Sequence, residues 1–344
     1  MKILCRITLI VIIGLGLHAC DRDKEIVLSG HTMGTRYHIR CLTHAYYHTK
    51  TLQDKIDKRL AQINDSMSTF NPKSEISQFN GLTQTVSFPI SDDFFQVMSI
   101  ASNLHTLTKG AWDGTVKPLV NLWGFGHTQI DTQDIPSQES ITLQLKSVGF
   151  HKINLSPNAI QKTEPTLSMN LASIAKGYGV DQIATLLQNE DIHQFVVEIG
   201  GEVYASGSKK DGSSWRVGIN RPAEDASFDD VYFVISLQNK AIATSGDYRN
   251  FHEINQKRYS HVIDPRTGWP VSNGIVSVSV IADSCTFADG LATALMVMGV
   301  EQSLNLVNQM DGVECMIVVS KEKQLTNYFS TGFHHYTFSD DAEK

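Results

Sequence analysis

The stretch DSCTFADGLATALMVMG, residues 283–299, constrains the fold of this chain more than any other. Its apolar residues recur at helical spacing, so it predicts a helix that buries one face in a core. We expect Asp283 to cap its start and Gly299 its end. Asp289 and Thr293 are four residues apart and therefore share a helix face. Mg²⁺ binds oxygens of this kind and takes its other ligands from phosphates and water, although a capped helix with two ordinary polar residues fits this segment equally well.

Working outward, the pattern of the whole chain predicts an α+β fold with largely antiparallel sheets and packed helices. Helical spacing indicates further helices at residues 52–67, from a Ser91 cap to near Gly110, and after Ser173. Strand patterns occur at Gln194–Ile199, Glu202–Ser206, Trp215–Asn220, Tyr232–Leu237, Ile275–Ala282 and Glu314–Val319. Because several of these strands follow each other through short turns, a regular βαβ array is disfavoured. The alternation in Ile275–Ala282 is typical of a half-buried strand.

The first residues of the chain have the pattern of an export signal. A basic start precedes a short apolar stretch, residues 7–17, which is too short for an ordinary membrane span. It ends in LHAC, which resembles a bacterial lipobox and would make Cys20 the lipidated first residue; His18 is unusual there, and an ordinary cleaved signal peptide is the alternative. Lipidation anchors a protein to the bilayer without spanning it. In a Gram-negative host, Asp21 favours retention at the inner membrane, on its periplasmic face.

Composition excludes several classes of protein. With 29 Lys and Arg against 36 Asp and Glu, the net charge of -7 gives no sign of nucleic-acid binding. Cys41, Cys285 and Cys315 form an odd set without CxxC spacing, so they predict neither a disulfide framework nor a zinc site. We expect free, mostly buried thiols. The length allows two domains, but the sequence shows no linker, repeat or low-complexity run that would divide them.

A candidate phosphate site lies in LASIAKGYG, residues 171–179, where small residues lead into a helix with Lys176 in its first turn. Backbone N–H groups at a helix start attract phosphate, and the lysine adds positive charge. The segment is not a P-loop because GxxxxGK[ST] is absent. A solvated surface lysine is the alternative.

Four further segments contain candidate ligand-binding residues. Gly34, in HTMGTRY, lets the backbone approach a ligand closely, or simply marks a turn before a strand. Phe70 has a ring that can stack on a flat ligand, although the residue type alone favours the core. Asp113, in AWDGT, can accept a hydrogen bond from a ring N–H or a hydroxyl, or close a turn. His261, in SHVIDPRTG, is the best candidate for a general base, because its ordinary pKa is near neutrality.

Taken together, these segments resemble the ApbE family, the FAD:protein FMN transferases. The matching blocks occur in the family's order over nearly all of the mature chain: HTMGTRY, SMSTFNPKSEISQFN, AWDGTVKPLVNLWGFG, LASIAKGYGVD, VEIGGEVYASG, SHVIDPRTGWPV and ADGLATALMVMG. The resemblance implies an ApbE-like architecture, related to the T-fold. It also implies this organisation: signal peptide 1–19, lipidated anchor and tether 20–30, flavin transferase domain 31–335 and C-terminal tail 336–344.

The resemblance further implies a site and a reaction. Family members split FAD at its pyrophosphate and attach the FMN half to a threonine of a target protein, with Mg²⁺. The implied metal ligands are the Asp289 carboxylate, the Thr293 hydroxyl and the Ser173 carbonyl, and His261 is implied in the transfer and in FAD binding. The other implied FAD contacts are Met33, Phe70, Ala111, Trp112, Asp113, Asn170 and Lys176. Asn170 stands where many members have Asp, and Phe70 where Tyr is frequent.

The resemblance suggests as targets the subunits of membrane redox pumps, namely the sodium-translocating NADH:quinone reductase (Nqr) or the related Rnf complex. Two other functions stay open at this point. One is a hydrolase that uses the same site to release FMN and AMP. The other is a lipid-anchored FAD-binding protein without turnover. A purely structural envelope lipoprotein would not need these seven ordered blocks.

Overall fold

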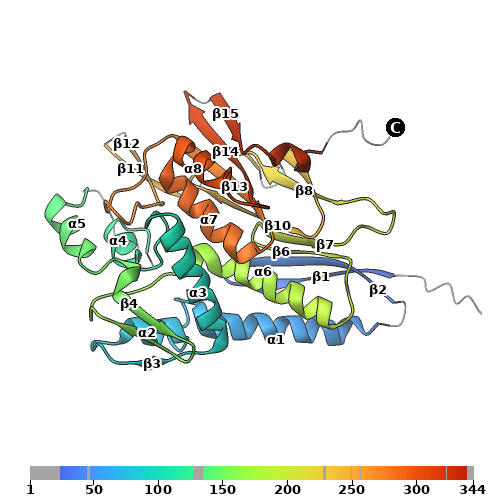
Figure 1. The fold of residues 1–344 in the computed structure, drawn as a ribbon, viewed down its shortest axis with the longest axis horizontal. Helices are drawn as coiled ribbons and strands as arrows, with labels where there is room; N and C mark the ends of the chain where they lie inside the picture. The colour runs from blue at the N-terminus through green and yellow to red at the C-terminus, as the bar shows by residue number, and fades with distance from the viewer. Residues whose placement is uncertain are drawn as a thin grey trace, which may run out of the picture.

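The computed structural model describes residues 24–44, 47–126, 135–227, 230–248, 250–255, 257–322 and 324–338. Its centre is an eight-stranded sheet in the order β1-β2-β6-β7-β10-β13-β14-β15 (Figure 1), and every neighbouring pair in it is antiparallel. This confirms the α+β class. The strands of this sheet are β1 (Lys24–Thr32), β2 (Thr35–Thr43), β6 (Phe195–Ile199), β7 (Glu202–Ser206), β10 (Lys240–Gly246), β13 (Ile275–Ala282), β14 (Glu314–Lys321) and β15 (Gln324–Phe329).

Helices and smaller sheets surround this centre. The helices are α1 (Thr49–Met67), α2 (Glu75–Gly81), α3 (Asp92–Leu107), α4 (Lys117–Leu122), α5 (Gln138–Leu145), α6 (Ala172–Asn189), α7 (Cys285–Met298) and α8 (Val300–Val307), with short 3₁₀ helices η1 (Phe150–Lys152) and η2 (Phe333–Tyr336). The smaller sheets pair β3 (Phe88–Pro89) and β4 (Ile153–Ser156) with β5 (Ala159–Lys162), β8 (Trp215–Asn220) with β9 (Val231–Leu237), and β11 (Phe251–Ile254) with β12 (Lys257–Ser260).

The large sheet is covered on both faces. Helices α6 and α7 lie against one face (Figure 1), α6 over β6 and β7 and α7 over β10 and β13. A separate buried cluster on the other face contains Trp215 and Ile235 of the β8–β9 pair together with Ile281 of β13. The prediction of a half-buried β13 is therefore wrong: its polar residues Ser277 and Ser279 are buried as well. Ser279 Oγ is satisfied by a 2.8 Å hydrogen bond with Thr244 Oγ1, as a buried hydroxyl requires.

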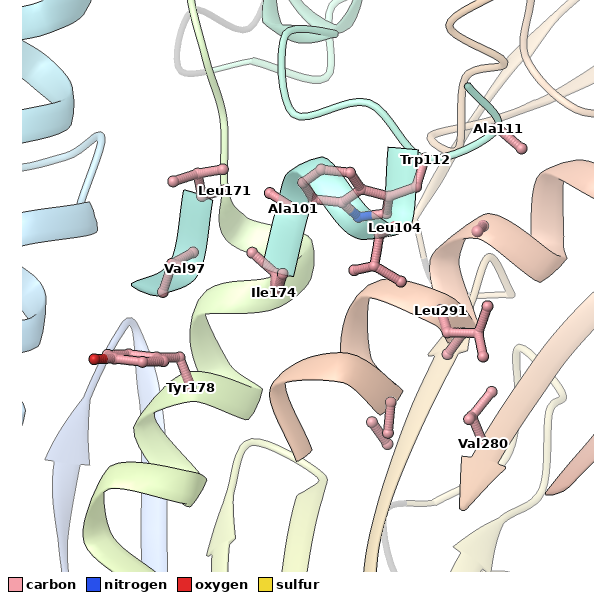
Figure 2. Close-up of a cluster of buried hydrophobic side chains, with 14 of the residues drawn as sticks. Val97, Ala101, Leu104, Ala111, Trp112, Leu171, Ile174, Tyr178, Val280 and Leu291 are labelled. Carbon is pink, nitrogen blue, oxygen red and sulfur yellow. The ribbon is translucent and has the colours of Figure 1, made fainter. Parts of the chain in front are cut away.

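The core between the helices is closely packed at the junction of α3, α6 and α7. Figure 2 shows Leu104 of α3 and Ile174 of α6 near the Trp112 ring, with Leu291 of α7 beside Val280 in the same cluster, and all of these side chains are buried. Burial of each large apolar side chain contributes about 1.5–3 kcal/mol to stability. The α3–α7 contact is so close that a Cβ on Gly290 would run into Leu104. This core fixes the segment around Trp112 against both helices.

Helix α7 ends at the predicted capping residue but does not begin at the predicted one. Its N-cap is Ser284, whose side chain accepts a hydrogen bond from the Phe287 N–H, whereas Asp283 accepts from Lys240 Nζ at 2.6 Å. The capping prediction for Asp283 is therefore wrong, because its carboxylate forms an ion pair with Lys240 of β10 instead. Gly299 ends the helix at φ 83°, which confirms the predicted C-cap. Cys41, Cys285 and Cys315 are free and buried, as predicted.

The ends of the chain lie partly outside the described residues. The predictions for residues 1–19 and for Cys20 fall there, as does most of the predicted 336–344 tail. Of that tail, Thr337 bridges to Ile235, and the Phe338 N–H donates to the Val234 carbonyl at 3.2 Å, so both residues lie against β9. Within the described ranges, none of the helices is long and apolar enough to cross a membrane.

Candidate functional site

Helices α6 and α7 pack antiparallel, in steps of one turn. Asp181 accepts a 2.8 Å hydrogen bond from the Cys285 N–H, and one turn earlier on α6 the Gly177 N–H donates to Asp289 Oδ2 at 3.0 Å. A further step of four residues brings Ser173 level with Thr293. Close approach is possible because residue 177 has no side chain: a Cβ there would lie 2.7 Å from the Cys285 carbonyl carbon. The predicted metal ligands thus come to facing turns of two helices.

These turns form one wall of a cavity of about 350 Å³. The size falls within the range of small-molecule sites in proteins. The cavity is lined by nine residues that the sequence analysis named: Ala111, Trp112, Asp113, Asn170, Ser173, Lys176, His261, Asp289 and Thr293. They come from four segments far apart in the sequence, which the fold brings together at this place.

A cluster of three ionisable groups, Lys176, Glu202 and Asp289, lines the cavity. Lys176 Nζ lies 2.8 Å from Glu202 Oε1 and 3.8 Å from Asp289 Oδ1, and both carboxylates are almost fully buried. Burial alone would lower the pKa of Lys176, but Asp289 and Glu202 outweigh it and raise that pKa. Burial raises the pKa of Glu202 to about 8, against the opposing effect of Lys176, and raises the pKa of Asp289 as well. The lysine is thus held as a cation between two carboxyl groups.

Oxygen atoms beside this cluster have the chemistry of a magnesium site. Thr293 Oγ1 lies 2.9 Å from Ser245 Oγ, next to the Asp289 carboxylate on the same helix face. In the described part of the chain, no three His, Cys, Asp or Glu side chains form a cluster that could hold a metal ion. A site built from one carboxylate, hydroxyls and a carbonyl lacks such a cluster, and Mg²⁺ often binds through one or two carboxylates plus substrate phosphates. These residues therefore fit the predicted metal.

His261 lines the same cavity, just after β12. Its Nδ1 is 2.9 Å from the Asn250 carbonyl oxygen. Because a carbonyl only accepts, Nδ1 carries the proton, and Nε2 is left as the basic atom of the neutral ring. Burial lowers the pKa of His261 below its ordinary value, outweighing the hydrogen bond to Asn250. The ring is therefore neutral at neutral pH, the state that a general base requires.

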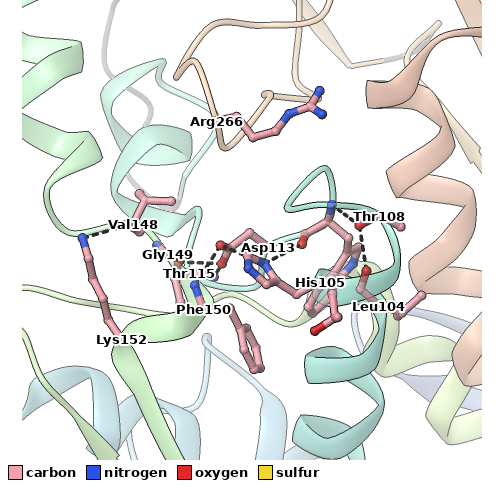
Figure 3. Close-up of polar contacts among 12 residues, drawn as sticks. Leu104, His105, Thr108, Asp113, Thr115, Val148, Gly149, Phe150, Lys152 and Arg266 are labelled. Atoms are coloured by element: carbon pink, nitrogen blue, oxygen red, sulfur yellow. Dashed lines mark hydrogen bonds and ion pairs between the residues drawn. The ribbon is translucent and has the colours of Figure 1, made fainter. Parts of the chain in front are cut away.

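The wall that contains Ala111, Trp112 and Asp113 is held by bonds within the chain. Figure 3 shows the buried Asp113 carboxylate accepting from the Thr115 N–H at 2.8 Å and the Phe150 N–H at 2.9 Å. His105 Nδ1 lies 3.3 Å from the same carboxylate, and this contact raises the pKa of His105. Of the two interpretations that the sequence left open, the structure supports the turn carboxylate. Asp113 lines the cavity and holds this wall in shape through these bonds.

The start of α6 is positioned by two further side chains of the cavity wall. Asn170 Oδ1 accepts from the Ala172 N–H at 2.9 Å, which satisfies one of the free donors at the helix start. Trp112 Nε1 donates to Ser173 Oγ at 3.1 Å. These bonds orient the first turn of α6, on which Ser173 and Lys176 lie.

Three of the named residues, Met33, Gly34 and Phe70, do not line this cavity. Met33 occupies the two-residue turn between β1 and β2, where positive φ at Met33 and Gly34 suits a tight hairpin. Its side chain packs over Gly179, where a Cβ would lie 2.9 Å from Met33 Cε. Phe70 follows α1 and is 82 % exposed, so the core position that its residue type favours is wrong.

The structure also places residues in the cavity to which the sequence analysis gave no role. Glu202 and Ser245 contact the named residues directly, and Asn250 orients His261. Glu202 lies in the quoted block VEIGGEVYASG, which was the one available signal. Ser245 and Asn250 lie outside every quoted block, and their neighbours in space are distant in sequence.

The chain is similar to known proteins over most of its length. Residues 33–317 match the ApbE family, and the chain belongs to that family. It is 41% identical over 319 residues to the FAD:protein FMN transferase of Vibrio cholerae, covering 92% of this chain and 94% of that protein. It is 36% identical to the Haemophilus influenzae protein of the same name, covering 98% of this chain and 99% of that protein. The solved flavin transferase ApbE from Vibrio cholerae superposes with a TM-score of 0.83 at 40% identity, over 91% of this chain and 99% of that one.

Proposed function

We propose that this member of the ApbE family is a Mg²⁺-dependent FAD:protein FMN transferase, which attaches FMN to a threonine hydroxyl of a target protein and releases AMP. One observation carries the proposal: the fold brings Lys176, the Asp289–Thr293 pair and His261 to a single cavity. These are a phosphate-binding cation, oxygen ligands for a metal and a base, which together are what phosphoryl transfer to a hydroxyl needs. The names of the relatives support the same activity.

The reaction is a displacement at the phosphorus atom of the FMN half. The threonine oxygen forms a bond to that phosphorus, and the bond from phosphorus to the bridging pyrophosphate oxygen breaks, so that AMP leaves. A threonine hydroxyl is a weak nucleophile, and Nε2 of neutral His261, whose Nδ1 is bonded to the Asn250 carbonyl, would accept its proton. Lys176, held as a cation by Glu202, binds a phosphate oxygen as negative charge develops on the leaving group.

The metal would be held by the Asp289 carboxylate, the Thr293 hydroxyl and the Ser173 carbonyl, and it would supply charge neutralisation at the pyrophosphate. Hydrogen bonds from Gly177 and with Ser245 orient the first two of these ligands. Such outer contacts commonly tune metal sites. Lys176 and the metal together would offset the negative charge of the phosphates and of Asp289.

The setting of the reaction is part of the same proposal. The lipobox-like LHAC sequence supports lipidation at Cys20 and anchoring at the periplasmic face of the inner membrane. The target would be a subunit of a membrane redox pump of the Nqr or Rnf type. A search of membrane fractions for FMN-modified proteins that disappear when this gene is deleted would test the proposed target.

The test of the activity is a mass measurement. The purified full-length protein is mixed with FAD, Mg²⁺ and a target fragment bearing a threonine motif of the D-G-[SA]-T-[GS]-[AS]-T type. A gain of one FMN residue on the fragment, abolished by EDTA, is the expected result. An unchanged fragment with FMN and AMP in solution would favour the hydrolase, and intact FAD would favour a binding protein. A fragment with the threonine replaced by alanine is the control for the modified position.

A further inference from the structure

Asp181, outside the cavity, connects the two helices that form its metal-binding wall. It lies on α6, one turn beyond Gly177, and its carboxylate accepts four hydrogen bonds from the start of α7. The donors are Ser284 Oγ at 2.7 Å, the Cys285 N–H at 2.8 Å, the Thr286 N–H at 2.9 Å and Thr286 Oγ1 at 2.6 Å.

These bonds take the place of capping interactions that a helix usually makes within its own chain segment. The first N–H groups of an α-helix have no partner inside the helix. The Ser284 hydroxyl accepts a hydrogen bond from the Phe287 N–H of its own helix. The Cys285 and Thr286 N–H groups donate instead to Asp181 of another helix. A carboxylate at this position is also favoured by the helix dipole. The start of α7 is therefore fastened to α6 by one side chain.

This fastening acts along the whole helix pair. From the Asp181–Cys285 contact, each step of four residues leads first to the Gly177–Asp289 hydrogen bond and then to the level of Ser173 and Thr293. A shift of α7 along α6 at its start would move Asp289 and Thr293 by the same amount, because a helix transmits displacement along its axis. The near-octahedral geometry that Mg²⁺ demands tolerates little such movement.

We propose that Asp181 is a positioning residue: it sets the register of α7 against α6 and thereby holds Asp289 and Thr293 opposite Ser173 in metal-binding geometry. The inference rests on the proposed metal site. It is distinct from a general contribution to stability, because it predicts an effect on metal affinity that a comparable capping loss elsewhere does not produce. Ser91 offers that comparison, since its side chain caps α3 by accepting from the Phe94 N–H.

The experiment measures the affinity of the full-length protein for Mn²⁺, used as a probe of the magnesium site, from the electron paramagnetic resonance signal of the free ion. The variants are Asp181→Ala, Asp181→Asn and the control Ser91→Ala, with thermal unfolding recorded for each. We expect Asp181→Ala to weaken Mn²⁺ binding about tenfold or more, as loss of supporting contacts commonly does. Asp181→Asn retains one oxygen that can accept from an N–H, so an intermediate loss is expected. Ser91→Ala should bind like the wild type.

Two results would overturn the inference while leaving the metal site in place. Wild-type affinity in a folded Asp181→Ala variant would show that the register does not depend on this carboxylate. An equal loss in Ser91→Ala would show that Asp181 acts only through stability. Failure of the wild-type protein itself to bind Mn²⁺ would be a different outcome, refuting the metal site and this role of Asp181 together.

Discussion

Replacement of Gly177 by alanine tests how tightly the α6–α7 contact constrains the molecule. A Cβ at this position would lie 2.7 Å from the Cys285 carbonyl carbon and 2.9 Å from Cβ of Asp289. Ordinary carbon–carbon contacts are about 3.5–4.0 Å. Neither neighbour is the end of a flexible side chain, so the helices must separate by about 1 Å.

The expected cost follows from two opposing effects. Overpacking of a well-packed core costs about 1–3 kcal/mol, while replacing a helical glycine by alanine returns about 0.5–1 kcal/mol. We therefore expect Gly177→Ala to lose about 1–2 kcal/mol of the free energy of unfolding. For a domain of about 300 residues, that loss lowers Tm by roughly 2–3 °C. A 1 Å displacement of reacting groups can also cost about a hundredfold in rate, so transfer should fall more than stability does.

The assay is thermal and urea unfolding of Gly177→Ala beside a matched control, Gly81→Ala. Gly81 ends α2, and no heavy atom lies within 4 Å of the place where its Cβ would be. The control should therefore be as stable as the wild type or slightly more stable. If Gly177→Ala behaved like Gly81→Ala in stability and in FMN transfer, the reasoning about the close helix contact would be refuted.

Four further predictions concern the site and the wall behind it. Asp289→Asn should lower Mg²⁺-dependent transfer about a hundredfold or more by loss of a metal ligand; near-normal transfer at saturating Mg²⁺ would remove the metal assignment. His261→Ala should lower transfer by about 10²–10⁴-fold with FAD affinity in titrations almost unchanged, and a collapse of that affinity would make His261 a ligand contact. Since burial lowers the pKa of His261 below 6.5, single-turnover transfer should persist down to pH 6.5 and fall only at lower pH, as the ring gains a proton; a fall beginning above pH 7 would contradict this. Asp113 raises the pKa of His105 above 6.5, so the stabilisation by His105 is complete below pH 6.5 and is lost as pH rises through the folded-state pKa. In urea unfolding, His105→Gln should therefore lose more free energy of unfolding at pH 6 than at pH 8.5. Equal losses at the two pH values would argue against the ion pair.

The predictable part of this molecule is the part that local pattern determines. The apolar spacing of residues 52–67 and 283–299 indicated α1 and α7, because a helix must bury one stripe whatever its neighbours are. The same pattern misjudged β13, because the sequence of a strand cannot show whether a second layer covers its polar face. It also misjudged Asp283, since the lysine that engages it belongs to β10.

The candidate site divides in the same way. Lys176, Asp289 and His261 could be named from the sequence because each lies in a block that resembles a known family. Glu202 was missed because its importance comes from Lys176, which reaches it from another element. Ser245 was missed because its hydroxyl meets Thr293 only when α7 lies on β10. Contacts of this kind depend on the three-dimensional arrangement, and the spacing of residues in the chain does not record them.

The strand order of the large sheet also has a consequence for the synthesis of the chain. From β7 onward, each strand of the sheet pairs with the strand of the sheet that precedes it in the chain. In contrast, β2 pairs with β6, so Tyr37 can pair with Ile199 only after more than 160 further residues have been made. The first hairpin is therefore made early and completes its pairing late, and such non-local pairing slows folding. The cavity takes its walls from residues made during this interval and after it. A nascent chain that has not passed residue 293 therefore has no complete cavity, and FMN transfer should begin only when almost the entire chain has been made and folded.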